Sequence, residues 1–264
     1  MDIAPVLPAT LRGIRAARRI SQLELALRIG VSQRHVSFVE QGRSRPSREL
    51  LLAWLQALDA PLGVRNAALL QAGYAPAYGT RPLGDPGLAD AEQALAMLLA
   101  HHDPMPAFVL DASWNVLRMN RGAMWLAATL VPEALHDPSR GPPNLLDLFV
   151  HPRGLAACLA NPGEAGPAWL SRLRQDAIAT PALWPRVDAV AARLAAAGID
   201  TPSAVPPSTP LLVTRYRSPV GELAFFATFT TFGSPTEVTL ASLRVEHLFA
   251  ADEATRRRLH DALR

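Results

Sequence analysis

The feature that most constrains the fold is a pair of short amphipathic helices within residues 21–42. Ser21 and Glu24 have the spacing of a capping box, which predicts that a helix begins after Ser21. Gly30 ends this helix, because glycine readily adopts the left-handed conformation found at helix C-termini. Ser32 then caps the next helix, which Gly42 ends. A connection this short places the second helix on an exposed corner.

Three more predicted helices complete a five-helix domain over residues 1–74. Apolar residues recur at helical spacing over 11–17, ahead of the helix pair. A fourth helix is predicted over 47–58, and a fifth begins at Pro61 and ends before Gly73. The first quarter of the chain is therefore expected to be all-helical.

Positive charge is concentrated in this domain. Residues 1–74 contain ten Arg and five acidic residues, whereas the remainder of the chain contains sixteen Arg and eighteen acidic residues. A basic domain joined to a slightly acidic one predicts an anionic partner for the basic domain. Nucleic acid is the commonest partner of this kind.

The helix between Ser32 and Gly42 turns one set of side chains outward, where they fit the major groove of DNA. Gln pairs with adenine and Arg with guanine, so Gln33 and Arg34 are predicted to contact bases. The other predicted DNA contacts are Ser37, His35 and Phe38 on the same helix, Gln22 and Ser32 at helix N-termini that face phosphate, and Arg43 and Arg45 in the following loop.

Residues 9–74 resemble the Cro/repressor-type (XRE) helix-turn-helix family. The resemblance rests on Gln22, Leu25, Ala26, Gly30, Val31, Ser32, Gln33, Val36, Ser37, Glu40 and Gly42. It implies a structural ion pair between an Arg of the first helix and the Glu that ends the recognition helix, here Arg15 and Glu40. A solvated helix face is the alternative for this pair, and a helical interaction module without DNA contact is the alternative for the domain.

Composition changes over residues 75–103, where repeated Pro and Gly residues predict a linker. Apolar residues at helical spacing from about 90 to 101 predict a connecting helix that packs on the second domain. We expect this helix to be the only connection between the two domains.

The second domain, residues 104–264, has strand patterns at both ends. Strands are predicted over 107–110, 116–119, 211–216, 223–232 and 242–249. Helices are predicted over 169–179 and 187–197, and Pro-containing segments at 161–163 and 202–210 interrupt the pattern. This order predicts an antiparallel sheet with helices on one face, so the whole chain is expected to be α+β.

Three segments of this domain, 107–120, 144–152 and 221–252, resemble the ligand-binding domain of MmyB-like regulators. The resemblance implies a PAS-like fold with a five-stranded antiparallel sheet and a cavity beneath it. It also implies a fatty acid or similar apolar molecule as the effector.

Aromatic side chains are the candidates for the cavity wall, because they commonly line small-molecule sites. The predicted ligand-binding residues are Trp114, Trp125, Phe149, Trp169, Phe225 and Phe229. Alternate residues of a strand face opposite sides, so Phe225 and Phe229 share one face and Phe226 lies on the other. Ordinary core packing is the alternative for each of these aromatic residues.

An enzyme is the competing class of function. The histidines have no metal-ligand spacing, and no nucleophile elbow or phosphate-binding loop occurs, so we expect no catalytic residue, metal or cofactor. His151 and Asp147, one helical turn apart, are the only pair considered, and a surface polar pair is the simpler interpretation. Cys158 is the single cysteine and is expected to be an inert thiol.

These patterns together predict a sequence-specific transcription regulator that binds a near-palindromic double-stranded DNA operator as a homodimer. Whether it represses or activates stays open. No apolar run reaches the length of a membrane span, and the N-terminal residues lack the pattern of a secretory signal, so a cytoplasmic location is expected. The alternative is a DNA-binding regulator without an effector, whose second domain serves only dimerisation or protein partners.

Overall fold

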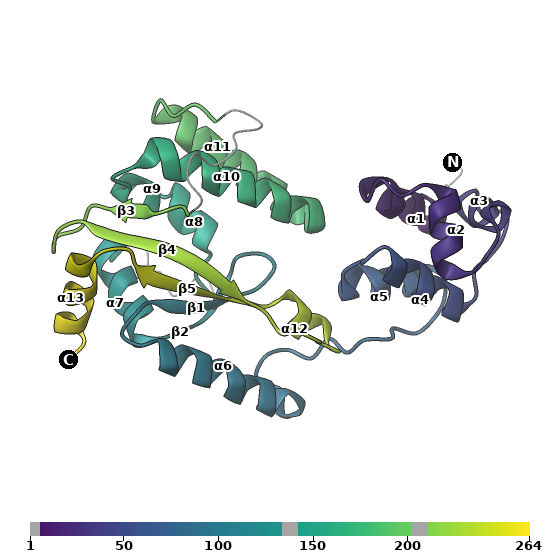
Figure 1. Ribbon diagram of the computed structural model, residues 1–264, viewed down its shortest axis with the longest axis horizontal. Coiled ribbons are helices and arrows are strands. Elements are labelled where there is room, and N and C mark those ends of the chain that lie inside the picture. The colour runs from purple at the N-terminus through teal and green to yellow at the C-terminus, as the bar shows by residue number, and fades with distance from the viewer. Residues whose placement is uncertain (1–5, 134–141, 202–210) are drawn as a thin grey trace. The chain divides into compact units, whose positions relative to one another are not determined.

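The computed structural model describes residues 6–133, 142–201 and 211–264 (Figure 1). The chain divides into two compact units, which we call the helical unit and the sheet unit. The helical unit comprises Met1–Pro82 and Ser234–Ala241, and the sheet unit comprises Leu83–Gly233 and Ser242–Arg264. The Pro-rich loop predicted over 202–210 lies outside the described residues.

Five helices form the N-terminal part of the helical unit, as the sequence predicts. They are α1 (Val6–Ala17), α2 (Gln22–Ile29), α3 (Gln33–Glu40), α4 (Arg48–Ala57) and α5 (Leu62–Gln71). Ser21 accepts a hydrogen bond from the backbone N–H of Glu24 at 3.0 Å, and Ser32 accepts one from that of His35 at 3.2 Å. Gly30 adopts φ +71°, the left-handed conformation that ends α2.

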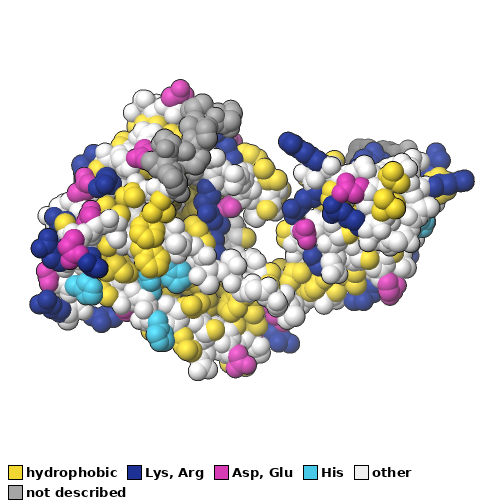
Figure 2. Space-filling view, in the orientation of Figure 1, with side chains coloured by type: hydrophobic (Ala, Val, Ile, Leu, Met, Phe, Trp, Pro, Cys, Tyr) yellow, Lys and Arg dark blue, Asp and Glu magenta, His cyan; other side chains and the backbone are white. Residues whose placement is uncertain are grey.

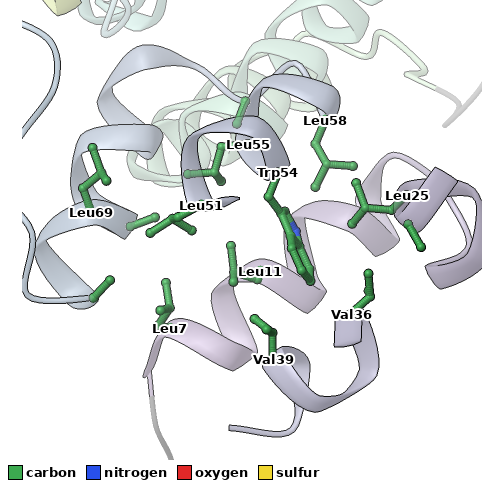
Figure 3. Packing of buried hydrophobic residues seen from close by; sticks show 14 residues of the cluster. Leu7, Leu11, Leu25, Val36, Val39, Leu51, Trp54, Leu55, Leu58 and Leu69 are labelled. Carbon is green, nitrogen blue, oxygen red and sulfur yellow. The ribbon is translucent and has the colours of Figure 1, made fainter. Parts of the chain in front are cut away.

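The core of this unit lies where the five helices meet. Trp54 of α4 is fully buried, and its ring lies between Leu11 of α1 and Leu25 of α2 (Figure 3). Val36 and Val39 of α3 are also buried in this cluster, which leaves the opposite side of α3 facing outward. The apolar residues of α3 therefore fix its position on the unit.

A short segment from far along the chain also belongs to the helical unit. Residues 234–241 contain most of α12 (Val238–Ser242), and the N–H of Val238 donates to the carbonyl oxygen of Gly79 at 2.8 Å. Glu237 pairs with Arg81 at 3.7 Å. The expectation of a single connection between the domains is therefore wrong, because these contacts are between residues about 160 positions apart and leave no local sequence pattern.

The sheet unit is built on one five-stranded antiparallel sheet in the order β2-β1-β5-β4-β3. Its strands are β1 (Ala107–Leu110), β2 (Val116–Met119), β3 (Thr214–Tyr216), β4 (Leu223–Thr230) and β5 (Arg244–Ala250). β5 lies in the centre, where it pairs with β1 on one side and with β4 on the other. The N- and C-terminal hairpins of the unit thereby form one sheet.

Helices accompany the sheet on both faces (Figure 1), whereas the sequence analysis expected them on one face, because strand patterns do not show which face a distant helix covers. They are α6 (Ala89–His102), α7 (Arg121–Leu130), α8 (Leu145–Val150), α9 (Leu155–Cys158), α10 (Pro162–Ala179), α11 (Trp184–Ala196) and α13 (Glu253–Ala262). Residues of α7 and α10 lie on the face that carries Phe225 and Phe229. On the other face, His102 of α6 contacts the rings of His247 and Phe249.

Several elements have bounds that differ from the predicted ones, among them α10 and β3. The segment 161–163 was expected to interrupt the helices, but Pro162 is the first residue of α10, since proline is tolerated in the first turn, where no N–H is needed. The strand expected over 211–216 is paired only over Thr214–Tyr216. Residues 211 and 212 instead line the cavity described below.

Candidate functional site

The outward face of α3 carries the residues that were predicted to contact bases. Gln33 and Arg34 are exposed, whereas His35, Ser37 and Phe38 are half-buried. The guanidinium of Arg34 lies 5.1 Å from the centre of the Phe38 ring, and that of Arg43 lies 5.9 Å from it. Phe38 thus supports two cationic side chains at the edge of α3, and Figure 2 shows further basic side chains on the surface of the helical unit.

Gln22 and Arg45, both predicted to contact DNA, have partners on other elements of the helical unit. The side-chain amide of Gln22 donates to Glu40 Oε2 at 2.8 Å. Arg45 donates to the carbonyl oxygen of Ala72, and its guanidinium lies 5.2 Å from the centre of the Tyr74 ring. Both side chains therefore hold helices together, a role that sequence position alone did not indicate.

Arg15 and Glu40 join α1 to the end of α3. Arg15 Nε donates to Glu40 Oε1 and Nη2 donates to Oε2, each at 2.7 Å, and Nη1 donates to the carbonyl oxygen of Ile20 at 2.8 Å. Glu40 is 1% exposed. Burial opposes its ionisation, but the hydrogen bonds from Arg15 and Gln22, together with the positive charges of Arg15 and Arg12, outweigh burial and hold the pKa of Glu40 below its ordinary value.

The sheet unit contains a cavity of about 290 Å³ between the sheet and the helices α7 and α10. Its aromatic lining residues are Phe108, Trp114, Trp169, Tyr216, Phe225 and Phe229. Apolar residues from α7, among them Leu126 and Leu130, close another side. The volume is close to the lower end of the range for small-molecule pockets, roughly 300 Å³.

Four of the six aromatic residues proposed for the cavity wall line it, namely Trp114, Trp169, Phe225 and Phe229. Phe149 lies behind the wall and stacks on Trp169 with 4.6 Å between ring centres. Trp125 packs in a neighbouring cluster with Leu126 and Leu130, outside the lining. The alternation along β4 places Phe225 and Phe229 together on the cavity face.

The cavity also has a charged end, which the sequence analysis did not identify. Arg172 of α10 and Glu246 of β5 both line it. Beside them, Arg244 pairs with Asp176 at 2.7 Å and lies 4.0 Å from the ring centre of Trp114. A signal was present in the sequence, because Arg244, Glu246 and Leu248 alternate along the strand on one face.

The histidine and cysteine considered as reactive groups have ordinary partners. Asp147 does not pair with the His151 ring, because its carboxylate binds Arg186, with 3.0 Å between Arg186 Nε and Asp147 Oδ1. Burial raises the pKa of the Cys158 thiol, which donates to the carbonyl oxygen of Leu130 at 3.3 Å. Within residues 6–133, 142–201 and 211–264, no group of three or more His, Cys, Asp or Glu side chains could hold a metal ion.

No helix among the described residues is both long enough and apolar enough to cross a membrane.

Comparison with protein families gives two matches. Residues 11–64 match the family described as Helix-turn-helix. Residues 91–262 match the family described as MmyB-like transcription regulator ligand binding domain. The second match spans more than half of the chain and contains all five strands of the sheet.

Comparison with individual proteins adds little to these matches. Comparison with curated proteins gives no significant match. Two structures of the clp gene regulator ClgR from Corynebacterium glutamicum are 33% and 30% identical, with TM-scores of 0.24 each. They cover 28% and 39% of this chain, and 90% and 97% of their own chains. An RNA-binding light-oxygen-voltage receptor covers 98% of this chain and 64% of its own, at 13% identity and a TM-score of 0.28.

Proposed function

The chain belongs to the MmyB-like transcription regulator ligand-binding-domain family and is a DNA-binding transcription regulator, and from this premise we propose two finer points. First, the protein binds a near-palindromic operator as a homodimer through the outward face of α3. Second, a small apolar effector in the cavity of the sheet unit changes its affinity for DNA.

The exposed pair Gln33 and Arg34 at the start of α3 is the observation that carries the first point. Both side chains project from a helix whose opposite face is buried, so the helix can enter the major groove without losing its packing. Dimers of this kind place two such helices roughly 34 Å apart, one turn of DNA, and a near-palindromic operator follows from the twofold symmetry.

Arg34→Ala and Arg43→Ala are expected to weaken DNA binding in different ways. Loss of a bidentate contact from Arg34 to a base should cost about 1–3 kcal/mol per half-site and relax preference at one base position. Loss of a phosphate contact from Arg43 should weaken binding to every sequence alike. It should also reduce the slope of log K against log salt concentration by about one. Fluorescence anisotropy on matched and mismatched operators at several salt concentrations measures both effects.

Both arginines lie over the same Phe38 ring, so each variant is the control for the other. If the two variants lose the same amount of sequence preference, the separate roles assigned to them are wrong.

The apolar lining of the cavity supports an effector such as a medium-chain or long-chain fatty acid. The lining combines leucines of α7 with aromatic residues of the sheet, and it includes only a few charged groups. Pockets for small molecules commonly have this composition.

Continuity of the chain offers a route from the cavity to the helical unit. β4 carries the lining residues Phe225 and Phe229, β5 carries Glu246 and Leu248, and the segment that joins the two strands belongs to the helical unit. A ligand that shifts β4 or β5 would therefore act on this segment directly. We propose this segment, together with α6, as the coupling element.

Binding of the effector is expected to change the affinity for operator DNA by about 5-fold to 150-fold, since typical coupling energies are about 1–3 kcal/mol. Native mass spectrometry of protein purified from cells tests for a bound molecule, and anisotropy titrations with and without added fatty acid measure the coupling.

Phe229→Trp, which adds volume inside the cavity, tests whether the cavity is the site of the effector. It should keep DNA binding and lose the response to ligand. The proposal of an effector is contradicted if saturating ligand leaves the DNA affinity unchanged. It is also contradicted if no fatty acid binds with a Kd below about 100 μM, which corresponds to about −5.5 kcal/mol.

A further inference from the structure

The charged end of the cavity contains two charged residues, each with one buried polar atom that has no hydrogen-bond partner. Arg172 and Glu246 both line the cavity, and neither Arg172 Nε nor Glu246 Oε2 has a hydrogen-bond partner among the described residues. Buried polar groups in proteins are nearly always hydrogen-bonded, because an unpaired one loses its hydration without compensation. Because Arg172 and Glu246 line the same cavity, this end of it can accommodate a polar group of a ligand.

Arg172 is held in place without a counter-ion. Its guanidinium lies 3.7 Å from the centre of the Phe229 ring, a cation–π contact that orients the side chain but does not neutralise it. The nearest acidic neighbour on α10, Asp176, is already engaged, because its Oδ2 accepts from Arg244 at 2.7 Å and from Trp114 Nε1 at 3.1 Å. Arg172 forms no ion pair with any carboxylate in the described part of the chain.

Glu246 is the second group, and it is 5% exposed. The charged or titratable groups that act on it are Arg244 on its own strand, Arg172 on α10 and Tyr216 on β3, and Asp176 acts on Arg172 in turn. Burial raises the pKa of Glu246 to about 7, although Arg244 and Arg172 act in the opposite direction. Near neutral pH this carboxyl therefore exists in both forms, and its protonated form is a hydrogen-bond donor.

We propose that this end of the cavity binds the carboxylate of an amphipathic acid, with Arg172 as its counter-ion and protonated Glu246 as a hydrogen-bond donor. The inference rests on the proposed function, because it requires an effector in the same cavity. A ligand carboxylate beside ionised Glu246 would meet a like charge, so the acid binds together with one proton. An uncharged amphiphile of the same chain length gains no charge pairing with Arg172.

Proton uptake gives the binding a definite pH dependence. A bound carboxylate raises the pKa of Glu246 further, so the ligand-bound state holds a proton that the free protein releases above about pH 7. Binding is therefore strongest below pH 7 and weakens as the pH rises, with Kd increasing about tenfold per pH unit. A free fatty acid is ionised throughout the range above pH 6, so its own titration adds nothing to this slope.

The test is a titration of the full chain with decanoate, decanol and methyl decanoate at pH 6, 7, 8 and 9, followed by the fluorescence of Trp114 and Trp169 in the cavity wall. Decanoate should bind more tightly than decanol at pH 6 and lose about tenfold in affinity per pH unit above pH 7. The affinities for decanol and for methyl decanoate should not change with pH.

Two variants test the roles of Glu246 and Arg172 separately. Glu246→Gln should remove the pH dependence and bind decanoate at pH 9 about as tightly as the wild type does at pH 6. Arg172→Met should abolish the preference for decanoate over decanol. Arg174→Met, two residues along the same helix and outside the cavity lining, should behave as the wild type.

The wild-type titrations alone can overturn the proposal, so it does not depend on the folding of any variant. If decanol binds as tightly as decanoate, or if the affinity for decanoate is constant from pH 6 to pH 9, the head-group site is wrong while the effector pocket stands. If none of the three molecules binds at any pH, the proposal that the cavity binds an apolar effector is wrong as well.

Discussion

Replacing Arg15 with alanine is expected to destabilise the helical unit by about 3–5 kcal/mol, the usual cost of removing one partner of a buried ion pair. The variant leaves the Glu40 carboxylate buried, with Gln22 as its remaining side-chain donor. Urea unfolding of the full chain, with amide hydrogen exchange in α1 to α5 to locate the change, measures this loss.

Arg28→Ala is the matched control, because Arg28 pairs with Glu24 on the surface, where both side chains are more than 40% exposed. Exposed pairs four residues apart on a helix contribute only about 0.3–0.5 kcal/mol. An equally small effect of Arg15→Ala would show that the contact with Glu40 does not stabilise this unit.

The same pair has a predicted pH dependence. The pKa of Glu40 is lowered in the folded protein, so its contribution to stability is present above the pKa of the unfolded chain and is lost as the pH falls through the folded value. In Arg15→Ala the uncompensated carboxylate should instead resist ionisation, so the difference between variant and wild type should be largest near neutral pH and shrink in acid.

The second large effect is expected for Phe225→Ala, which should destabilise the sheet unit by about 3–5 kcal/mol. Phe225 is 1% exposed and packs with Leu223 and Leu259 beside the cavity. Truncation would remove this packing and extend the existing cavity. Thermal unfolding monitored by tryptophan fluorescence measures the loss, since four of the five tryptophans lie in the sheet unit.

Phe226→Ala is the control from the adjacent position of β4. Its ring is half-buried on the opposite face and stacks on Phe249 with 5.2 Å between ring centres. Loss of that stacking contact should cost about 0.5–1.5 kcal/mol, in addition to the small contribution from the apolar area that is no longer buried. Equal losses for the two variants would contradict the assignment of Phe225 to the cavity face and Phe226 to the other face.

Features set by neighbouring residues could be predicted from the sequence. Ser21, Gly30 and Ser32 fix the ends of α2 and the start of α3 through their own backbone and side-chain hydrogen bonds, so local sequence is sufficient. The strands of the first hairpin, over 107–110 and 116–119, likewise coincide with β1 and β2. The alternation of Phe225 and Phe226 follows from strand geometry alone.

Features that depend on distant residues could not be predicted in the same way. The packing of 234–241 with Gly79 and Arg81 joins positions about 160 residues apart. The engagement of Gln22 with Glu40 depends on how α2 crosses α3, which periodicity does not specify. The polar end of the cavity was overlooked for a related reason, since Arg172 and Glu246 come together only when α10 covers the sheet.

The most direct test of the central claim is sequencing of the fragments that the purified full chain retains from sheared genomic DNA, with Arg34→Ala run in parallel. The account predicts that the wild type enriches an inverted repeat whose half-site centres are about 10 base pairs apart, and that Arg34→Ala loses preference at one base position of each half-site. Retention of fragments with no shared sequence, or the same enriched sequence at equal strength for both proteins, would contradict the claim that α3 selects the operator.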